Sequence, residues 1–143
     1  MSAYVLDASV LASWLLPGQS TPKAEALFDH APILTLIAPR FFVYEAHRLM
    51  LKAERSGRFP SADIDDWLAM LWSLPLEVEA EASDGDLERV RALARAEGLS
   101  FYDALYLDVG LRRNMAVASG DMQLLRAAER RGLPIYDVRS PYD

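Results

Sequence analysis

The amino-acid sequence predicts an α/β fold, with a central, mostly parallel sheet that carries helices on its faces. The first observation is that short apolar stretches alternate with longer segments of helical periodicity, which is the pattern of consecutive βαβ units. The second is that no linker, internal repeat or low-complexity tract divides the 143 residues. We therefore expect a single domain over residues 1–143, long enough to bury a substantial core.

The expected strands are short apolar runs that end at a polar residue or a turn former. The first ends on Asp7, and the second is closed by Pro39. The third alternates apolar and acidic residues, as a strand or an edge strand does, and the fourth consists of small residues. In chain order they are AYVLD (3–7), ILTLIAP (33–39), LEVEA (76–80), MAVAS (115–119) and LPIYDV (133–138).

The expected helices place apolar residues at helical spacing and begin or end at capping residues. Thr21 with Pro22, and separately Ser61, suit helix starts, whereas Pro17-Gly18 and Gly98 suit helix ends. In chain order the helices cover residues 8–16, 21–31, 40–57, 61–74, 83–98, 101–113 and 121–132.

The composition excludes several kinds of site. Without cysteine there are no disulfides or thiolate ligands, and His30 and His47 are too isolated for a zinc site. A net charge of −6 argues against a nucleic-acid partner, because phosphate contacts need a basic surface. An acidic site lowers the net charge without removing local arginine clusters, however, so the composition leaves the partner open. No basic leader precedes the first apolar run, which Asp7 interrupts. We expect neither a signal peptide nor a membrane span, and a cytoplasmic protein.

Three aspartates fall where the ligand site of a parallel sheet is expected, beyond the carboxyl ends of the strands. Asp7 ends the first strand, Asp121 follows the fourth, and Asp103 lies in the first turn of the helix over 101–113. On a helical wheel Asp103 faces inward. Asp108 points away, where we expect it to pair with Arg112 in solvent.

Taken one at a time, these acids have structural explanations. Asp7 and Asp121 can cap the helices that follow them, and Asp103 competes with Ser100 for a third cap. Glu45 lies at the edge of an apolar arc and, alone, is typical of a partly solvated helix residue. A functional interpretation depends on the four acids acting together.

If they converge, their chemistry is restricted. Carboxylates without histidine or cysteine are hard ligands that suit Mg²⁺ or Mn²⁺. Crowded carboxylates have raised pKa values and gain from a divalent cation, which can polarise a phosphodiester and activate water. An aspartate-nucleophile phosphatase is another class, but Asp7-Ala8-Ser9 lacks the DxD or DxT spacing that it needs.

Four segments together resemble the PIN domain, specifically the VapC-like toxins of bacterial toxin–antitoxin pairs. They are VLDASVLASWLLP (5–17), APRFFVYEAHRLM (38–50), LSFYDALYLDVG (99–110) and VASGDMQLLRAAERRGLPIY (117–136). The resemblance spans nearly the whole chain, and YDALYL is its most specific part. It implies a three-layer α/β/α sandwich and a Mg²⁺-dependent ribonuclease in which Mn²⁺ can replace Mg²⁺. It further implies a homodimer restrained by a cognate VapB-like antitoxin.

The resemblance also implies roles for individual residues. The acidic site corresponds to Asp7, Glu45, Asp103 and Asp121. Of these, the three aspartates are the implied metal ligands, and Ser9 and Ser119 are implied to orient a ligand or a water. The chain departs from the pattern after Asp121, where Met-Gln replaces the basic residues of many relatives, and at Asp108 and Gly110.

Two further questions stay open at this point. Tyr44 and Leu51 lie on the charged side of their helix and, with Trp67, Leu71 and Trp72, form either an antitoxin groove or part of the core. The runner-up function is a non-catalytic RNA- or protein-binding module whose acids are helix caps. Replacing aspartate by asparagine distinguishes the two interpretations. Asparagine caps a helix about as well as aspartate does, whereas a metal site does not tolerate the loss of a carboxylate.

Overall fold

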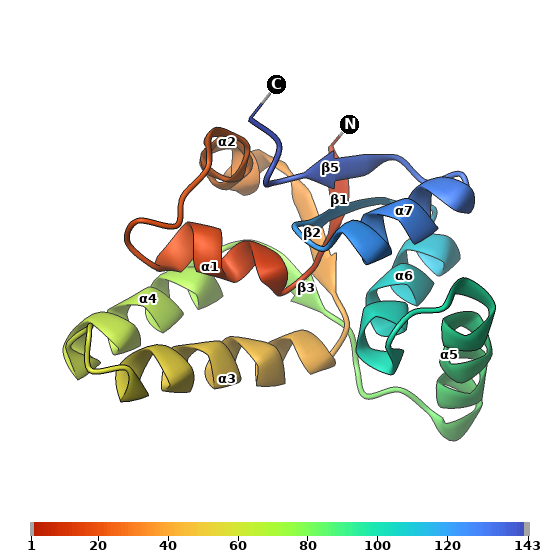
Figure 1. Cartoon of the computed structure of the whole chain (residues 1–143), viewed down its shortest axis with the longest axis horizontal. Helices are drawn as coiled ribbons and strands as arrows, with labels where there is room; N and C mark the ends of the chain where they lie inside the picture. The colour runs from red at the N-terminus through yellow and green to blue at the C-terminus, as the bar shows by residue number, and fades with distance from the viewer. Residues whose placement is uncertain (1, 142–143) are drawn as a thin grey trace.

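A five-stranded, all-parallel sheet forms the centre of the computed structural model, which describes residues 2–141 (Figure 1). The strand order is β3-β2-β1-β4-β5, so the third strand lies at an edge, as its alternating pattern allows. The strands are β1 (Ala3–Leu6), β2 (Thr35–Ala38), β3 (Leu76–Val78), β4 (Ala116–Ser119) and β5 (Ile135–Asp137).

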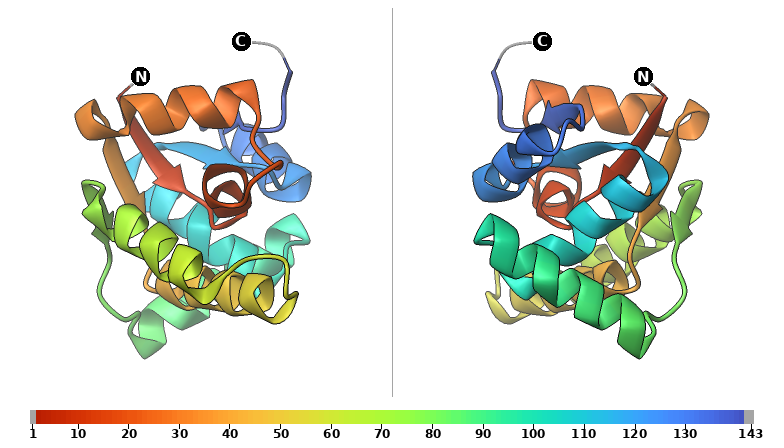
Figure 2. Two further views of the ribbon diagram at one scale, coloured as in Figure 1. Left: turned by 90° about the vertical axis from the view of Figure 1, so that its left-hand side faces the viewer. Right: turned by 90° about the vertical axis from the view of Figure 1, so that its right-hand side faces the viewer.

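Seven α-helices in the described residues connect the strands and lie on both faces of the sheet (Figure 2). This arrangement confirms the predicted α/β fold. The helices are α1 (Ser9–Leu15), α2 (Pro22–His30), α3 (Phe41–Arg55), α4 (Ser61–Ser73), α5 (Asp84–Glu97), α6 (Phe101–Arg113) and α7 (Met122–Arg130).

The predicted helix ends are right to within a few residues, because capping residues lie just outside the helices they cap. Thr21 caps α2, with Pro22 in its first turn, and α6 has the predicted bounds. The second strand begins two residues later than predicted, at Thr35. A short 3₁₀ helix, η1 (Ala31–Ile33), occupies the preceding residues, and its proline suits a first helical turn.

Helix α6 packs against two neighbouring strands of the sheet, β1 and β4. All four residues of β4 are buried. A Cβ built on Gly110 of α6 would lie 3.0 Å from a Leu133 methyl carbon and 3.3 Å from a methyl carbon of Val117 in β4. Gly110 therefore allows the close approach of helix and sheet, which explains one departure from the family pattern.

The α3–α4 surface carries several exposed apolar side chains. Tyr44 and Leu51 are 55% and 43% exposed and Trp72 is 40% exposed, whereas Leu71 belongs to the core. Trp67 is half-buried and packs edge-on against Phe59 at 5.3 Å. The core interpretation is therefore right for Trp67, which packs against the core, and wrong for Trp72. None of the helices described in residues 2–141 combines the length and apolarity needed to cross a bilayer.

Candidate active site

Asp7 lies at the carboxyl end of β1, beside the end of β4. The two strands are neighbours, with Leu6 opposite Ala118, and the Asp7 amide donates to the Ala118 carbonyl at 3.0 Å. The Asp7 side chain is buried, and its Oδ2 accepts hydrogen bonds from the Ser9 hydroxyl at 2.5 Å and the Ser119 hydroxyl at 2.8 Å. The neighbouring strands therefore supply both an acid and a hydroxyl that holds it.

The two serine hydroxyls also connect Asp7 to the loop after β4. Ser9 Oγ accepts a hydrogen bond from the Gly120 amide, and Ser119 Oγ accepts one from the Asp121 amide, each at 2.8 Å. Each hydroxyl thus has a defined acceptor and a defined donor. This network fixes the position of Asp7 relative to Asp121.

The pKa of Asp7 is raised above its ordinary value. Burial is the largest cause, because a carboxylate in the interior loses its hydration. The Ser9 and Ser119 hydroxyls counteract this by donating to the ionised form, and the charge of Asp121 raises the pKa further. Since Ala8 is the N-cap of α1 and no side chain caps that helix, helix capping does not explain Asp7.

Asp121 does cap its helix. Its Oδ1 accepts hydrogen bonds from the amides of Gln123 at 2.9 Å and Leu124 at 3.3 Å, at the start of α7. The capping interpretation is therefore right for this acid. Its carboxylate nevertheless influences both other aspartates, because its charge raises the pKa of Asp7 and of Asp103.

Asp103 is not a cap. Ser100 is the N-cap of α6, and its hydroxyl accepts a hydrogen bond from the Asp103 amide at 3.1 Å. The half-buried Asp103 carboxyl has its pKa raised to about 7, first by desolvation and then by a hydrogen bond with Asp121 and by the charges of Asp121 and Asp7. Only the Ser100 hydroxyl acts in the opposite direction. Near pH 7 the Asp103 carboxyl is therefore partly protonated.

Glu45 reaches the same region from α3. Both of its carboxylate oxygens accept hydrogen bonds from Arg48, one from Nε and one from Nη2, each at 3.0 Å. Arg48 is well exposed, so the pair contributes little stability. The Glu45–Arg48 pair matters for its position, because both side chains line the cavity that the aspartates share.

A cavity of about 280 Å³ brings the predicted residues together. Its lining includes Asp7, Ser9, Glu45, Asp103 and Asp121. The predicted Ser119 lies behind Asp7 and is completely buried.

Tyr106 also lines this cavity, although the sequence did not single it out as a site residue. Its hydroxyl is the one buried side-chain polar atom of residues 2–141 without a hydrogen-bond partner. Burial and the charges of Asp7 and Glu45 raise the pKa of the Tyr106 hydroxyl, so it stays protonated. The nearby Ala8 backbone has a smaller, opposite effect on this pKa, but it does not form a hydrogen bond of good geometry with the hydroxyl. An unpaired buried hydroxyl at an acidic cavity suits a ligand oxygen or a water.

The donor chemistry of this cavity fits a hard divalent cation. Within residues 2–141 no three acidic or histidine side chains are already arranged to hold a metal ion. The aspartates nonetheless supply oxygen donors only. The pKa values of Asp7 and Asp103 are raised first by burial and then by neighbouring carboxylate charge, and a cation would relieve that repulsion. Asp7, Asp103 and Asp121 are the residues that would hold it.

The predicted position of Asp108 is wrong. Its side chain is buried, not exposed, because α5 packs over this face of α6. Arg89 of α5 donates to both Asp108 oxygens, at 2.9 and 3.0 Å, and the expected Arg112 pairs with Oδ2 at 2.8 Å. Asp108 thus joins two helices and does not line the acidic cavity.

Comparison with known proteins shows the family and agrees with the fold. A family model described as the PIN domain matches residues 4–130. The crystal structure of PAE2754 from Pyrobaculum aerophilum superposes with a TM-score of 0.72 at 25% identity, over 94% of this chain and 90% of that one. FitAcB from Neisseria gonorrhoeae gives 0.64 at 16% identity, over 95% and 98%, and so supports the fold alone. A search of curated proteins finds no match. The chain belongs to the PIN domain family.

Proposed function

We propose that the protein is a Mg²⁺-dependent endoribonuclease and the toxin of a VapBC-type toxin–antitoxin pair. PIN domains are generally nucleases, which supports the reaction class. The observation that carries the proposal is the convergence of Asp7, Asp103 and Asp121 on one cavity, where only Asp121 has a capping role. Burying mutually repelling carboxylates is costly and is typical of a functional site.

The residue roles follow from their positions. Asp7, Asp103 and Asp121 hold Mg²⁺, for which Mn²⁺ substitutes, and Glu45 positions the attacking water as ligand or base. The bound cation supplies Lewis-acid polarisation of the phosphodiester and lowers the pKa of water. Ser9 and Ser119 keep Asp7 in one orientation through their paired hydrogen bonds.

Two other residues act beside these acids. Arg48, the basic residue of the cavity lining, offsets the charge of Glu45. Tyr106 offers a protonated, unpaired hydroxyl to a phosphate oxygen or to the water. Hydrolysis of this kind leaves a 3′-hydroxyl and a 5′-phosphate.

The partners belong to the same proposal. The exposed apolar side chains of α3 and α4, among them Tyr44, Leu51 and Trp72, suit a docking segment of a VapB-like antitoxin. An arginine from that segment would be attracted by the acidic cavity and would block it. We also propose a homodimer, by analogy with VapC-like proteins.

The alternative is a non-catalytic PIN-like module that binds RNA or protein and uses its acids as caps. This interpretation accounts for Asp121, which caps α7, but Ser100 and not Asp103 caps α6. It also leaves the burial of Asp7 without a purpose.

The test is cleavage of a mixed RNA panel, including tRNAs, by purified protein with Mg²⁺ or with EDTA. Asp103→Asn should abolish cleavage. Its matched control is Asp86→Asn, which changes an aspartate at the same position of α5, after a serine N-cap. Full activity of Asp103→Asn, or cleavage that persists in EDTA, would overturn the proposal.

A further inference from the structure

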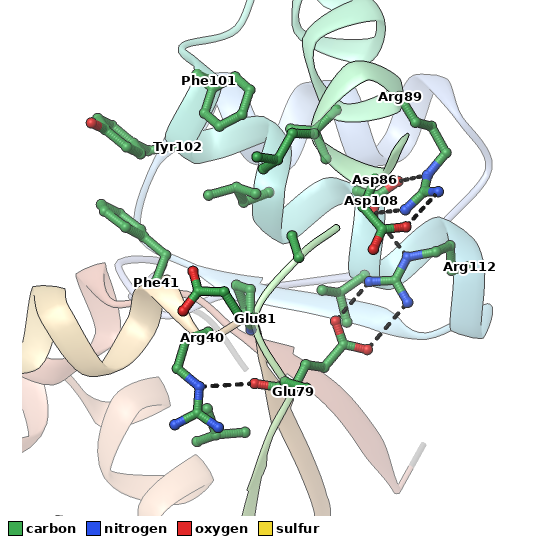
Figure 3. Close-up of a pocket in the computed structure, with 18 of the residues that line it drawn as sticks. Arg40, Phe41, Glu79, Glu81, Asp86, Arg89, Phe101, Tyr102, Asp108 and Arg112 are labelled. Carbon is green, nitrogen blue, oxygen red and sulfur yellow. Dashed lines mark hydrogen bonds and ion pairs between the residues drawn. The ribbon is translucent and has the colours of Figure 1, made fainter. Parts of the chain in front are cut away.

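A second and larger cavity, of about 540 Å³, adjoins the acidic one. It lies between the first turn of α3, one side of α6 along its length, β3 with the segment that follows it, and α5 (Figure 3). Its volume is in the range of pockets that hold small ligands. Phe41 and Tyr102 line both cavities, so they form a shared wall.

This wall is an aromatic platform. The Phe41 and Tyr102 rings stack with centroids 4.3 Å apart and an angle of 4° between their planes. Phe101 meets Tyr102 edge-on at 6.2 Å, which supports the platform from the side. Tyr102 is 56% exposed, whereas the next residue, Asp103, belongs to the acidic cavity and is half-buried. Exposed, pre-stacked rings are what unpaired nucleic-acid bases stack upon.

Three of the four arginines that line this pocket are already paired with carboxylates. Arg89, Arg112 and Arg113 make these pairs with acids of the pocket wall, at distances from 2.6 to 3.0 Å. The fourth, Arg40, pairs with no carboxylate of the described residues, and its Nε donates to the Glu79 carbonyl oxygen at 3.1 Å. On the side of the paired arginines a phosphate would lack partners, whereas a neutral base can enter.

Glu81 is the exception among the acids of the pocket. No basic side chain of the described residues pairs with it, and its one hydrogen bond is a long one of 3.4 Å from the Tyr44 hydroxyl. Figure 3 shows its carboxylate on the side of the Phe41 and Tyr102 rings, away from the Arg89–Arg112 cluster. A free carboxylate beside a stacking platform accepts hydrogen bonds from the edge of a stacked base.

We propose that this pocket binds one unpaired base of the RNA, guanine by preference, next to the phosphate that is cut. The base stacks on Tyr102, and Glu81 accepts hydrogen bonds from its Watson–Crick edge. Guanine presents two adjacent donors, the N1–H and the N2 amino group, which match the two oxygens of a carboxylate. This inference rests on the proposed function for its RNA substrate, and it makes the pocket a determinant of sequence preference.

The test measures binding of guanosine, adenosine, cytidine and uridine 5′-monophosphates to the full chain in EDTA, by NMR titration. We expect guanosine monophosphate to bind most tightly. Glu81→Gln should weaken it about tenfold with smaller effects on the others, and Tyr102→Ala should weaken all four about tenfold, as loss of a stacking partner does. The matched control is Glu77→Gln, because Glu77 lines the same pocket but is paired with Arg113.

Neither metal nor cleavage enters this experiment, so its result is independent of the nuclease assay. Equal binding of the four nucleotides, or guanosine monophosphate binding unchanged in Glu81→Gln and Tyr102→Ala, would overturn the base pocket even if the protein cuts RNA. Selective binding by a protein that cuts no RNA would support the pocket and count against the proposed nuclease.

Discussion

Replacing Asp103 by asparagine should stabilise the metal-free protein above neutral pH. In the folded state the pKa of Asp103 is raised to about 7, from an ordinary value of 3.8. Between these values the folded state binds more protons than the unfolded state, so this group makes stability fall as pH rises from about 4 to 7. Above pH 7 the full penalty of the ionised group is present. Asparagine carries no charge and avoids it.

The magnitude follows from the size of this pKa difference. At about 1.4 kcal/mol for each pKa unit, a fully buried and isolated group would cost about 4 kcal/mol. Asp103 is only half-buried, so solvent screens its charge and we reduce this to about 1–2 kcal/mol. Loss of a favourable first-turn charge offsets about 0.5 kcal/mol. The expected net gain is about 1 kcal/mol, or an increase in Tm of about 3–4 °C.

The assay is thermal unfolding of both proteins in EDTA at pH 8 and at pH 4.5, where the difference should largely disappear. Asp86→Asn is the control, because Asp86 has the same helix position but a pKa lowered to about 2 by the Ser83 cap and by Arg89. Its replacement should lower the Tm. A lower Tm for Asp103→Asn at pH 8 would refute the reasoning and make Asp103 a structural residue.

Three other variants test neighbouring parts of the structure. Burial alone would raise the pKa of Asp108, but the ion pairs with Arg89 and Arg112 outweigh burial and lower this pKa. The stabilisation that the ionised Asp108 gives the folded state is therefore present above pH 4, and it is lost as pH falls through the pKa of Asp108 in the folded state. Asp108→Asn should cost about 1–2 kcal/mol at pH 7 in urea unfolding, because both arginines stay partly solvated, and a change below 0.3 kcal/mol would contradict a stabilising role. Ser119→Ala removes a hydrogen bond that lowers the pKa of Asp7, so the acid limb of the pH dependence of kcat/KM should move to higher pH; an unchanged profile would argue against this role. Tyr106→Phe removes an unpaired hydroxyl, so unfolding free energy should stay within about 0.5 kcal/mol while RNA cleavage falls, and unaltered cleavage would exclude the hydroxyl from the reaction.

Periodicity and capping chemistry predicted the fold because they are local properties of the chain. Ser100 and Thr21 could be recognised as cap candidates from their neighbours, and Asp7 could be placed at a strand end from its apolar run alone. The resemblance named the acids that the structure brings to one cavity. Predicting these features requires no information about which helices pack against each other.

Features that depend on contacts between distant helices could not be predicted in this way. A helical wheel gives the direction of Asp108 but not the helix that covers it, and Arg89 comes from 19 residues away. Similarly, nothing in the local pattern indicates that Glu81 stays unpaired beside Tyr102, since the pocket forms only when the segment after β3 meets α3 and α6. Tyr106 could have been noticed as a tyrosine in an otherwise apolar stripe.

The most direct test of the central claim is calorimetric titration of Mn²⁺ into the wild-type protein and into Asp103→Asn at pH 7.5. If Asp7, Asp103 and Asp121 form a cation site, the wild type binds Mn²⁺ and Asp103→Asn binds at least tenfold more weakly. Equal binding by both proteins, or none by either, would contradict the claim. The acids would then be structural, and the binding-module interpretation would stand.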